Sequence, residues 1–464
     1  MVPVSIPKKW DYEADVIIVG AGTAGLPAAW VAAEAGAKVA VLELMSYCAS
    51  SLALVNVGPA FAGTDMQKEQ GVEDSPEQYY KDGVELAKGD PEMWRKYTDN
   101  QLDTYNWCKK IGVKFGDLFA PPAHTRKRGF FVKGSDMLRV IEKAAKEKGA
   151  EILFLHRATR LITDPETGRV LGLKVKAKDD KEEKNFKANK GVIITSGGFG
   201  RNKEMVEEYG PEFVDWVPTM PPGHLGDGLK MALALGAGTK DLGHAVCGSF
   251  AVDVVSKTGV MDFVGYAGGV MVNVNGQRFW DEATRKSFYG LLSEKGMQQP
   301  GGFFYVVFDE KAKNNVRHGK LGKAKPYQGD TIEELAQKAG IDPKGLKETI
   351  DKYNKDIKSV GYDTVCDRQT LEGCDGVPVT IDTPPYYAVK CKGSTSSFKG
   401  GIKIDTSCHV LNQYGEVIPG LYAAGEVTGG LWSAHGTYLP CTMVTAAMTF
   451  GRIAAKNAVA ERSK

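Results

Sequence analysis

The feature that most constrains this chain is a strand–turn–helix–strand unit near its N-terminus. Residues 15–19 read Asp-Val-Ile-Ile-Val, an apolar run that predicts a buried parallel strand. The turn Gly20-Ala21-Gly22-Thr23-Ala24-Gly25 follows, and residues 26–35 have helical composition, with Gly36 as a C-cap signal. Residues 39–43 form the second strand. A G-x-G-x-x-G turn in this setting predicts a dinucleotide-binding α/β fold.

Each glycine of this turn has a physical reason. Gly20 permits the tight turn, Gly22 lets the backbone approach a pyrophosphate, and Gly25 lets helix and strand pack closely. The helix N-terminus then faces the phosphate charge. Glu43 ends the second strand, where a carboxylate binds ribose hydroxyls. With this acidic residue in place, the turn is expected to bind a nucleotide and not to be a purely structural glycine turn. The motif alone does not distinguish FAD from NAD.

Length, charge and cysteine spacing exclude several function classes. With 464 residues the chain is too long for one compact core, so we expect two domains. The net charge is +2, and we expect the short run Arg126–Lys127–Arg128 to be a solvated loop, so nucleic acid is not an expected partner. The eight cysteines have no zinc or iron–sulfur spacing, so no metal site is expected. No export signal or membrane-length apolar stretch is visible, which predicts a cytoplasmic protein.

Changes of pattern along the chain predict a domain interrupted by an insertion. Capping signals predict helices over residues 76–88 and 91–111, and residues 192–195 form another apolar strand. In the middle of the chain, strands alternate with a lysine-rich helical region, 331–359. Residues 396–464 again show the pattern of the N-terminal part, with a strand, a glycine-rich turn and a long helix. The middle block is therefore expected to be a separate domain.

Motifs spread over nearly the whole chain point to a known family. They include DVIIVGAGTAGLPAAWVAAEAGAKVAVLE, DSPEQYYKDG, GRVLGLKV, HLGDGLKMALALGA, GGVMVNVNGQRFWDEATR, GGIKID, IPGLYAAGEVTGG and MTFGRIAA. Their order and spacing resemble those of fumarate reductases, succinate dehydrogenase flavoprotein subunits and 3-ketosteroid dehydrogenases. The resemblance implies FAD as cofactor and an α/β fold with a Rossmann-like FAD-binding domain in two segments. An inserted α+β capping domain would close over the flavin. The implied ranges are 1–244 and 395–464 for the FAD-binding domain and 245–394 for the capping domain.

The resemblance also implies which residues contact FAD. Thr195 and Gly197 would lie on the pyrophosphate side, and Asp227 would lie at a turn close to the flavin. The segment 439–444 would run along the isoalloxazine ring, at a helix N-terminus suited to its negative N1–O2 edge. Helix capping is the alternative role of Asp227 and of Glu426. The complete implied set is Gly20, Gly22, Ala24, Gly25, Glu43, Ala158, Thr195, Gly197, Asp227, Gly425, Glu426, Cys441, Met443 and Val444.

The active-site end departs from the family's dicarboxylate-binding pattern. Where the family has a histidine before a Gly-Gly strand, residues 396–401 read Ser-Ser-Phe-Lys-Gly-Gly. His244 is not followed by the family's Pro-Thr, and Tyr438 stands where the family has a carboxylate-binding arginine. We therefore do not expect fumarate or succinate to be the substrate.

Two residues are the catalytic candidates. In the ketosteroid dehydrogenase branch, a tyrosine near the place of Tyr438 binds the substrate carbonyl, and a neutral phenol suits an enone better than a carboxylate. Arg285 resembles the proton-delivering arginine of fumarate reductases, although its spacing from Arg278 is one residue short. The alternatives are a core tyrosine with a satisfied hydroxyl and a surface salt bridge from Arg285 to Asp281 or Glu282.

These residues predict an FAD-dependent oxidoreductase that acts on a C–C bond next to a carbonyl. Flavin N5 would exchange hydride with the β carbon, and Tyr438 would polarise the carbonyl. We expect a neutral unsaturated substrate, steroid-like or aromatic, in either reaction direction. Because haem, iron–sulfur and FMN-attachment signals are missing from the sequence, an external electron donor or acceptor is expected. The alternatives are a flavin oxidase or hydroxylase, or a flavoprotein subunit of an electron-transfer assembly.

Overall fold

A computed structural model describes residues 6–54, 57–121, 123–247, 252–255, 268–282, 291–314, 324–371, 377–433 and 436–461. The chain divides into two compact units. The first contains Met1–Val214, Met220–Ala245 and Ser397–Lys464, and the second contains Asp215–Thr219 and Val246–Ser396. The short segment Asp215–Thr219 belongs to the second unit because its strand β10 (Val217–Pro218) pairs with Ser394 and Thr395 of β17. No local sequence signal marks this short segment as part of the second unit.

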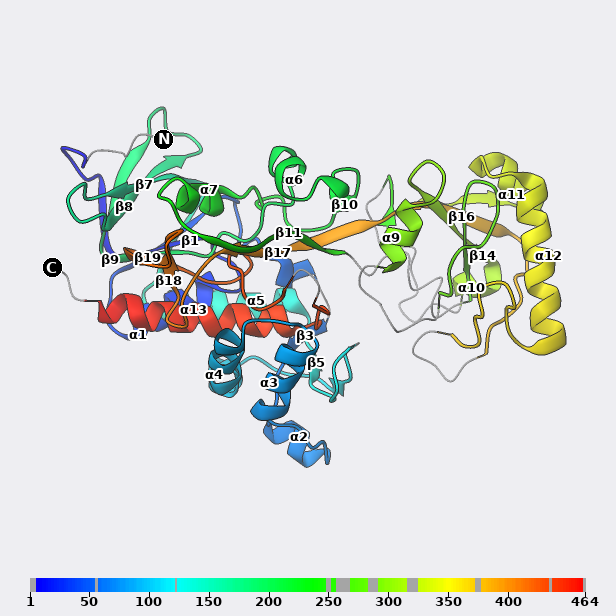
Figure 1. Ribbon diagram of the computed structural model, residues 1–464, viewed down its shortest axis with the longest axis horizontal. Coiled ribbons are helices and arrows are strands. Elements are labelled where there is room, and N and C mark those ends of the chain that lie inside the picture. The colour runs from blue at the N-terminus through cyan, green and yellow to red at the C-terminus, as the bar shows by residue number, and fades with distance from the viewer. Residues whose placement is uncertain are drawn as a thin grey trace. The chain divides into compact units, whose positions relative to one another are not determined.

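The core of the first unit is an eight-stranded sheet with the order β18-β19-β9-β1-β2-β6, extended by β8 beside β9 and by β7 beside β8 (Figure 1). The strands β6, β2, β1, β9 and β19 run parallel to one another, whereas β18 and β8 are antiparallel to their neighbours β19 and β9. The expected strand at residues 192–195 is the end of the longer strand β9. The bounds are β1 Tyr12–Val19, β2 Val39–Glu43, β6 Glu151–Phe154, β7 His156–Thr163, β8 Val170–Ala177, β9 Lys184–Ile194, β18 His409–Leu411 and β19 Val417–Ala423.

The register of the parallel strands brings their carboxyl ends together. Val19 lies opposite Leu42 on one side and Ile194 on the other, and Ala423 lies opposite Ile194. In open α/β sheets, ligands bind beyond this edge. The residues that end or directly follow these strands are Gly20, Glu43, Thr195 and Ala424.

Helices α1 (Gly25–Glu34) and α13 (Thr442–Ala460) lie side by side against this sheet (Figure 1). They approach closely because a Cβ atom on Gly451 would lie 2.2 Å from Ala24 O. The packing therefore places the start of α1 against the middle of α13. The other helices of this unit are α2 Asp65–Glu69, α3 Pro76–Glu85, α4 Pro91–Lys110, α5 Gly134–Glu147, α6 Lys203–Tyr209 and α7 Asp227–Leu233, with 3-10 turns at Ser51–Leu54 and Pro211–Phe213.

The paired helices α3 and α4 begin where the sequence predicts. The Ser75 hydroxyl accepts a hydrogen bond from the Gln78 amide, and the Asp90 carboxylate accepts from the amides of Glu92 and Met93. Side-chain caps of this kind satisfy amides that lack an intrahelical partner. A small antiparallel sheet, β3-β5-β4, lies in the same unit, with the bounds Val57–Ala60, Leu118–Phe119 (β4) and Gly129–Phe131 (β5).

The second unit is built on an antiparallel sheet with its own hydrophobic core. The expected helical region 331–359 forms two helices, because Gly340 ends the first one in a left-handed conformation with φ of 74°. The bounds are β12 Val252–Asp253, β13 Val270–Val272, β14 Phe304–Asp309, β15 Tyr327–Gly329, β16 Tyr386–Lys392, α9 Leu291–Met297, α10 Glu310–Asn314, α11 Ile332–Ala339 and α12 Pro343–Val360. The chain passes between the units in β11 (Thr239–Cys247) and β17 (Ser394–Ile402). Within the described ranges, no helix is both long enough and apolar enough to span a membrane.

Candidate cofactor and active site

The glycine turn between β1 and α1 packs tightly against protein at two of its three glycines. A Cβ atom on Gly20 would lie 2.6 Å from Thr195 O, and one on Gly25 would lie 1.9 Å from Gly20 O. At Gly22, the nearest described atoms, which include Ala49 O, would be 3.8 Å away. The fold therefore requires glycine at positions 20 and 25, whereas Gly22 leaves room for a ligand against the backbone.

Glu43 ends β2 with its side chain almost fully buried. Its Oε2 accepts a hydrogen bond from the Ala21 amide at 3.0 Å, and its Oε1 accepts from the Met45 amide at 2.9 Å. Burial raises the pKa of Glu43, while these backbone hydrogen bonds lower it. The two amides fix the carboxylate beside the turn, and each oxygen keeps a lone pair for a further donor.

The start of α1 meets the loop after β19. Ala24 is the N-cap residue of α1, and a Cβ atom on Gly425 would lie 3.0 Å from the Ala24 Cβ. Two segments about four hundred residues apart in the chain therefore form one surface beside the glycine turn.

The glycine-rich loop after β9 lies between two polar side chains. Thr195 donates its hydroxyl hydrogen to carbonyl oxygens at the end of β1, at 3.0 and 2.9 Å, so it braces the turn. A Cβ atom on Gly197 would lie 2.8 Å from His224 Nε2, and one on Gly198 would lie 2.5 Å from Glu426 Oε1. The sequence did not single out His224, which belongs to the loop before α7.

Asp227 is held by an ion pair. Both of its carboxylate oxygens accept hydrogen bonds from Arg157, each at 2.7 Å, and this interaction raises the pKa of Arg157. Gly226 occupies the N-cap position of α7, so the N-cap role considered for Asp227 is wrong. Ala158 is buried next to Arg157 in β7. The bidentate pair therefore ties α7 to β7 at this end of the predicted site.

Two cavities meet at Glu426. The larger, with about 430 Å³ of empty space that includes open solvent, is lined by apolar side chains such as Met93, Trp432 and Phe450 and also by Lys399, Glu426 and Thr428. The smaller has a volume of about 210 Å³ and is lined by Gly197 and Gly198. Glu426 lines both, and its side chain is only 9% exposed. The cavities connect the loop after β9 with the start of α13.

The start of α13 presents backbone amides, of which the Thr442 amide donates to Leu439 O at 3.4 Å. Cys441 is its N-cap residue in a left-handed conformation with φ of 69°, and no described side chain caps the helix. No acidic residue lies in the first turn, which contains Met443 and Val444. Such a helix end attracts negative charge.

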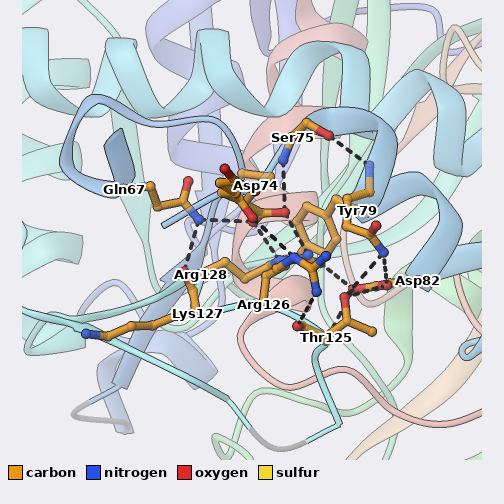
Figure 2. Close-up of polar contacts among 12 residues, drawn as sticks. Gln67, Asp74, Ser75, Tyr79, Asp82, Thr125, Arg126, Lys127 and Arg128 are labelled. Carbon is orange, nitrogen blue, oxygen red and sulfur yellow. Dashed lines mark hydrogen bonds and ion pairs between the residues drawn. The ribbon is translucent and has the colours of Figure 1, made fainter. Parts of the chain in front are cut away.

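A buried ion cluster supports this helix start (Figure 2). Arg128 pairs with Asp74 at 2.9 Å and with Asp82 at 2.8 Å, and its guanidinium lies 4.2 Å from the ring centre of Tyr79. Tyr79 in turn shares a 2.6 Å hydrogen bond with Thr442, the first residue of α13. The expectation that the run 126–128 is a solvated loop is therefore wrong for Arg128, because two carboxylates distant in sequence hold it in the interior. Arg126 and Lys127 are exposed, as expected.

His124 and Tyr438 lie next to the same helix start. His124 Nε2 is 2.8 Å from Pro440 O, and burial together with the charge of Arg128 lowers the pKa of His124 to about 4. The imidazole is therefore neutral near pH 7 and donates from Nε2. The half-buried ring of Tyr438 packs against Trp432, with ring centres 5.6 Å apart.

Arg285 lies outside the described residues. Its neighbour Glu282 is fully buried and pairs with Arg278 and Arg368, and Arg278 also pairs with Asp363. Because Arg285 is not described, its alternative role in a surface salt bridge to Asp281 or Glu282 stays a prediction. Arg278 belongs to the interior of the second unit.

The arrangement fits an extended dinucleotide cofactor. Among the buried polar atoms that lack a hydrogen-bond partner within the described part of the chain are three close to the glycine-rich loop after β9, namely Ser196 Oγ, His224 Nδ1 and Glu426 Oε1. Buried polar atoms without partners are rare in folded proteins. Together with the open face of Gly22 and the start of α13, which no described side chain caps, these atoms fit a polar ligand in the first unit.

Comparison with known proteins decides the family. A family model described as "FAD binding domain" matches residues 15–442. The chain belongs to this family of FAD-binding proteins. FAD is its cofactor, and the protein is an FAD-dependent oxidoreductase acting on CH–CH groups.

Three proteins show the range of this likeness. A probable fumarate reductase of Shewanella frigidimarina is 30% identical over 96% of this chain and 74% of its own. The open conformation of a flavocytochrome c3 fumarate reductase is 29% identical with a TM-score of 0.87, over 97% of this chain and 79% of its own. A 3-ketosteroid-Δ4-(5α)-dehydrogenase from Rhodococcus jostii, solved with 4-androstene-3,17-dione, is 26% identical with a TM-score of 0.74, over 99% of this chain and 100% of its own.

Proposed function

We propose that this protein transfers hydride between FAD and the carbon β to the carbonyl of a neutral, unsaturated substrate. An enone with a steroid-like or aromatic body is the proposed class. The observation that carries the proposal is Tyr438, a hydrogen-bond donor whose ring packs against Trp432, which lines a mainly apolar cavity. The likeness to a ketosteroid dehydrogenase solved with an enone supports the same class.

The proposed cofactor site follows the carboxyl edge of the sheet. Gly22 and the start of α1 would hold the pyrophosphate, Glu43 the adenosine ribose, and Ala158 the adenine side. Glu426 would bind beside the flavin, and the helix N-terminus at Met443 would face its negative edge. The remaining positions proposed to contact FAD are Gly20, Ala24, Gly25, Thr195, Gly197, Asp227, Gly425, Cys441 and Val444.

Bound FAD supplies a hydride acceptor and donor at N5, and the chain supplies orientation and proton transfer. We propose that the Tyr438 hydroxyl donates to the substrate carbonyl, so that negative charge developing on its oxygen is stabilised. Amides at the start of α13 would add to this stabilisation. Arg285 is proposed to exchange the proton at the α carbon. An arginine has a high pKa, so this role requires a site that excludes water.

Electrons must be exchanged with a second partner. We propose a diffusible or protein donor or acceptor external to this chain, because its sequence carries no haem-attachment or iron–sulfur motif. The reaction direction then depends on that partner and on the substrate that the cell supplies.

Product analysis with an artificial redox partner tests the proposal. The holoprotein is incubated without oxygen with a reduced viologen and, separately, with a steroid enone, an aromatic enone, cinnamate and fumarate. The reverse reaction uses the saturated ketones and an artificial acceptor. We expect turnover of a neutral enone or its saturated partner. Turnover of fumarate with no turnover of any neutral carbonyl compound in either direction would contradict the proposal.

A further inference from the structure

His224 is a buried histidine in the loop before α7. The residue is 7% exposed, and its ring packs on Gly197 so closely that a Cβ atom there would lie 2.8 Å from Nε2. Its own backbone oxygen accepts a hydrogen bond from the Arg201 amide at 3.0 Å. The loop is therefore fixed, and the imidazole has a defined position against the glycine-rich loop after β9.

One nitrogen of this ring faces a carboxylate without forming a hydrogen bond to it. Nδ1 lies 3.6 Å from Glu426 Oε2, and both side chains are 9% exposed. Nδ1 of His224 and Oε1 of Glu426 are both buried without a hydrogen-bond partner among the described residues. Two neighbouring buried polar atoms without partners indicate a polar group that binds between them.

The chemistry of the pair restricts this group. A carboxylate accepts hydrogen bonds, whereas an imidazole N–H donates one. An alcohol hydroxyl satisfies both, since it donates its hydrogen and accepts on its oxygen. A phosphate oxygen does not fit, because it would lie against the negative charge of Glu426 and has no hydrogen to donate.

We propose that His224 and Glu426 together bind one sugar hydroxyl of FAD, with Nδ1–H donating to the hydroxyl oxygen and Glu426 accepting its hydrogen. The role of His224 is new, and it depends on the FAD binding that the family establishes, not on the proposed substrate. FAD has hydroxyls on its ribityl chain and on its adenosine ribose. Glu426 also lines the cavity that contains Met443, which lies on the proposed flavin side and favours a ribityl hydroxyl. The loop of His224 packs against Met45, two residues after Glu43, on the proposed ribose side, which favours a ribose hydroxyl.

Binding measurements on purified apoprotein test this inference. Dissociation constants are measured by titration calorimetry for FAD and for ADP, which has the ribose and the pyrophosphate but no ribityl chain. The variant His224→Leu removes the donor. The variant His224→Asn keeps an amide N–H near the place of Nδ1. His409→Asn is the matched control, because its Nδ1 bonds to Asp405 at 2.8 Å at the edge of the sheet.

We expect His224→Leu to weaken FAD binding about tenfold, the effect of losing one hydrogen bond to a buried polar group. His224→Asn should restore most of the affinity, and His409→Asn should change nothing. Weaker binding of FAD alone assigns the ribityl hydroxyl, and equal weakening for ADP assigns the ribose hydroxyl. Unchanged affinity for both ligands in His224→Leu would overturn the proposal and mean that an ordered water satisfies the pair. Thermal unfolding of each apoprotein shows whether a variant has lost its fold. If His224→Leu does not fold, equal FAD affinity of His224→Asn and His224→Ala would overturn the proposal.

Discussion

The hydroxyl of Tyr79 lies 2.6 Å from the hydroxyl of Thr442, the residue at which α13 begins. Both side chains are fully buried. Tyr97 donates a further hydrogen bond to Tyr79 at 3.2 Å, and Arg128 lies over the Tyr79 ring. Helices α3 and α4 thus hold the helix start that we propose faces the flavin.

Removing the Tyr79 hydroxyl should affect both stability and the flavin. In Tyr79→Phe the buried Thr442 hydroxyl loses its partner, so we expect a loss of about 1–2 kcal/mol in the free energy of unfolding. We also expect a shift in the absorption maxima of bound FAD. Tyr105→Phe is the control, because its hydroxyl bonds to Asp65 at 2.6 Å away from α13. A Tyr79→Phe holoprotein with an unchanged flavin spectrum would contradict this role.

The buried cluster of Arg128, Asp74 and Asp82 should be sensitive to loss of its cation. Arg128→Met leaves two buried carboxylates without their counter-charge, and such breaks cost about 3–5 kcal/mol. Arg126→Met, in the exposed part of the same run, should change stability by less than about 0.5 kcal/mol. Chemical denaturation of both variants measures the difference. Similarly small losses of unfolding free energy in Arg128→Met and Arg126→Met would show that the cluster contributes little to stability.

The same cluster predicts a pH effect of defined sign. Burial raises the pKa of Asp74 although Arg128 pairs with it. A carboxyl with a raised pKa in the folded state contributes stability at low pH, and this contribution is lost as pH rises through that pKa. Loss of the Arg128 cation raises the pKa of Asp74 further, because the nearby positive charge no longer favours the ionised carboxylate. The stability difference between Arg128→Met and the unaltered protein should therefore narrow as pH falls, and a widening difference would be contrary to this account.

His124 should give a second, opposite pH dependence. Its pKa is lowered from 6.5 to about 4 in the folded protein. The unfolded chain therefore takes up a proton that the folded protein does not, and the stability contributed by neutral His124 is lost as pH falls from 6.5 toward about 4. His124→Gln cannot titrate but can still donate to Pro440. Thermal unfolding across this range should show a weaker pH dependence for the variant than for the unaltered protein, and equal slopes would refute the assignment.

Substitutions at two glycines of the turn, Gly25 and Gly22, should have different effects, one on folding stability and the other on cofactor binding. Gly25→Ala forces a Cβ atom to 1.9 Å from Gly20 O, and we expect a destabilisation of about 1–3 kcal/mol or more. In Gly22→Ala the new Cβ atom would lie 3.8 Å from the nearest described atoms, so the apoprotein should keep its stability and lose FAD affinity. Unfolding of the apoproteins and titration with FAD distinguish the two effects. Normal FAD affinity in Gly22→Ala would contradict the proposed pyrophosphate site.

The sequence predicts those parts of the fold that depend on local pattern. The strand ending at Val19, the turn, α1 and the strand ending at Glu43 are found within a few residues of their expected limits, because buried strands and glycine turns have strong local signals. Membership of the FAD-binding family could also be predicted, from the same strand–turn–helix–strand unit together with the motif near Gly425. The helix starts after Ser75 and Asp90 were equally predictable from capping residues.

Long-range contacts are what the sequence could not reveal. Arg128 is buried because its partners Asp74 and Asp82 come from a different segment, and His124 reaches Pro440 across 316 residues. A lone histidine such as His224 has no local signal that separates a ligand-binding residue from a core residue. These contacts became apparent only when the fold brought the segments together.

The most direct test of the central claim is the reoxidation of the reduced flavin. Reduced holoprotein and its Tyr438→Phe variant are mixed without oxygen with a neutral enone or with fumarate, and the return of flavin absorbance is followed by stopped flow. We predict rapid reoxidation by the enone, slowing by about 10²-fold in Tyr438→Phe with unchanged FAD binding, and little reaction with fumarate. Faster reoxidation by fumarate than by any enone, or an equal enone rate in the variant, would contradict the account.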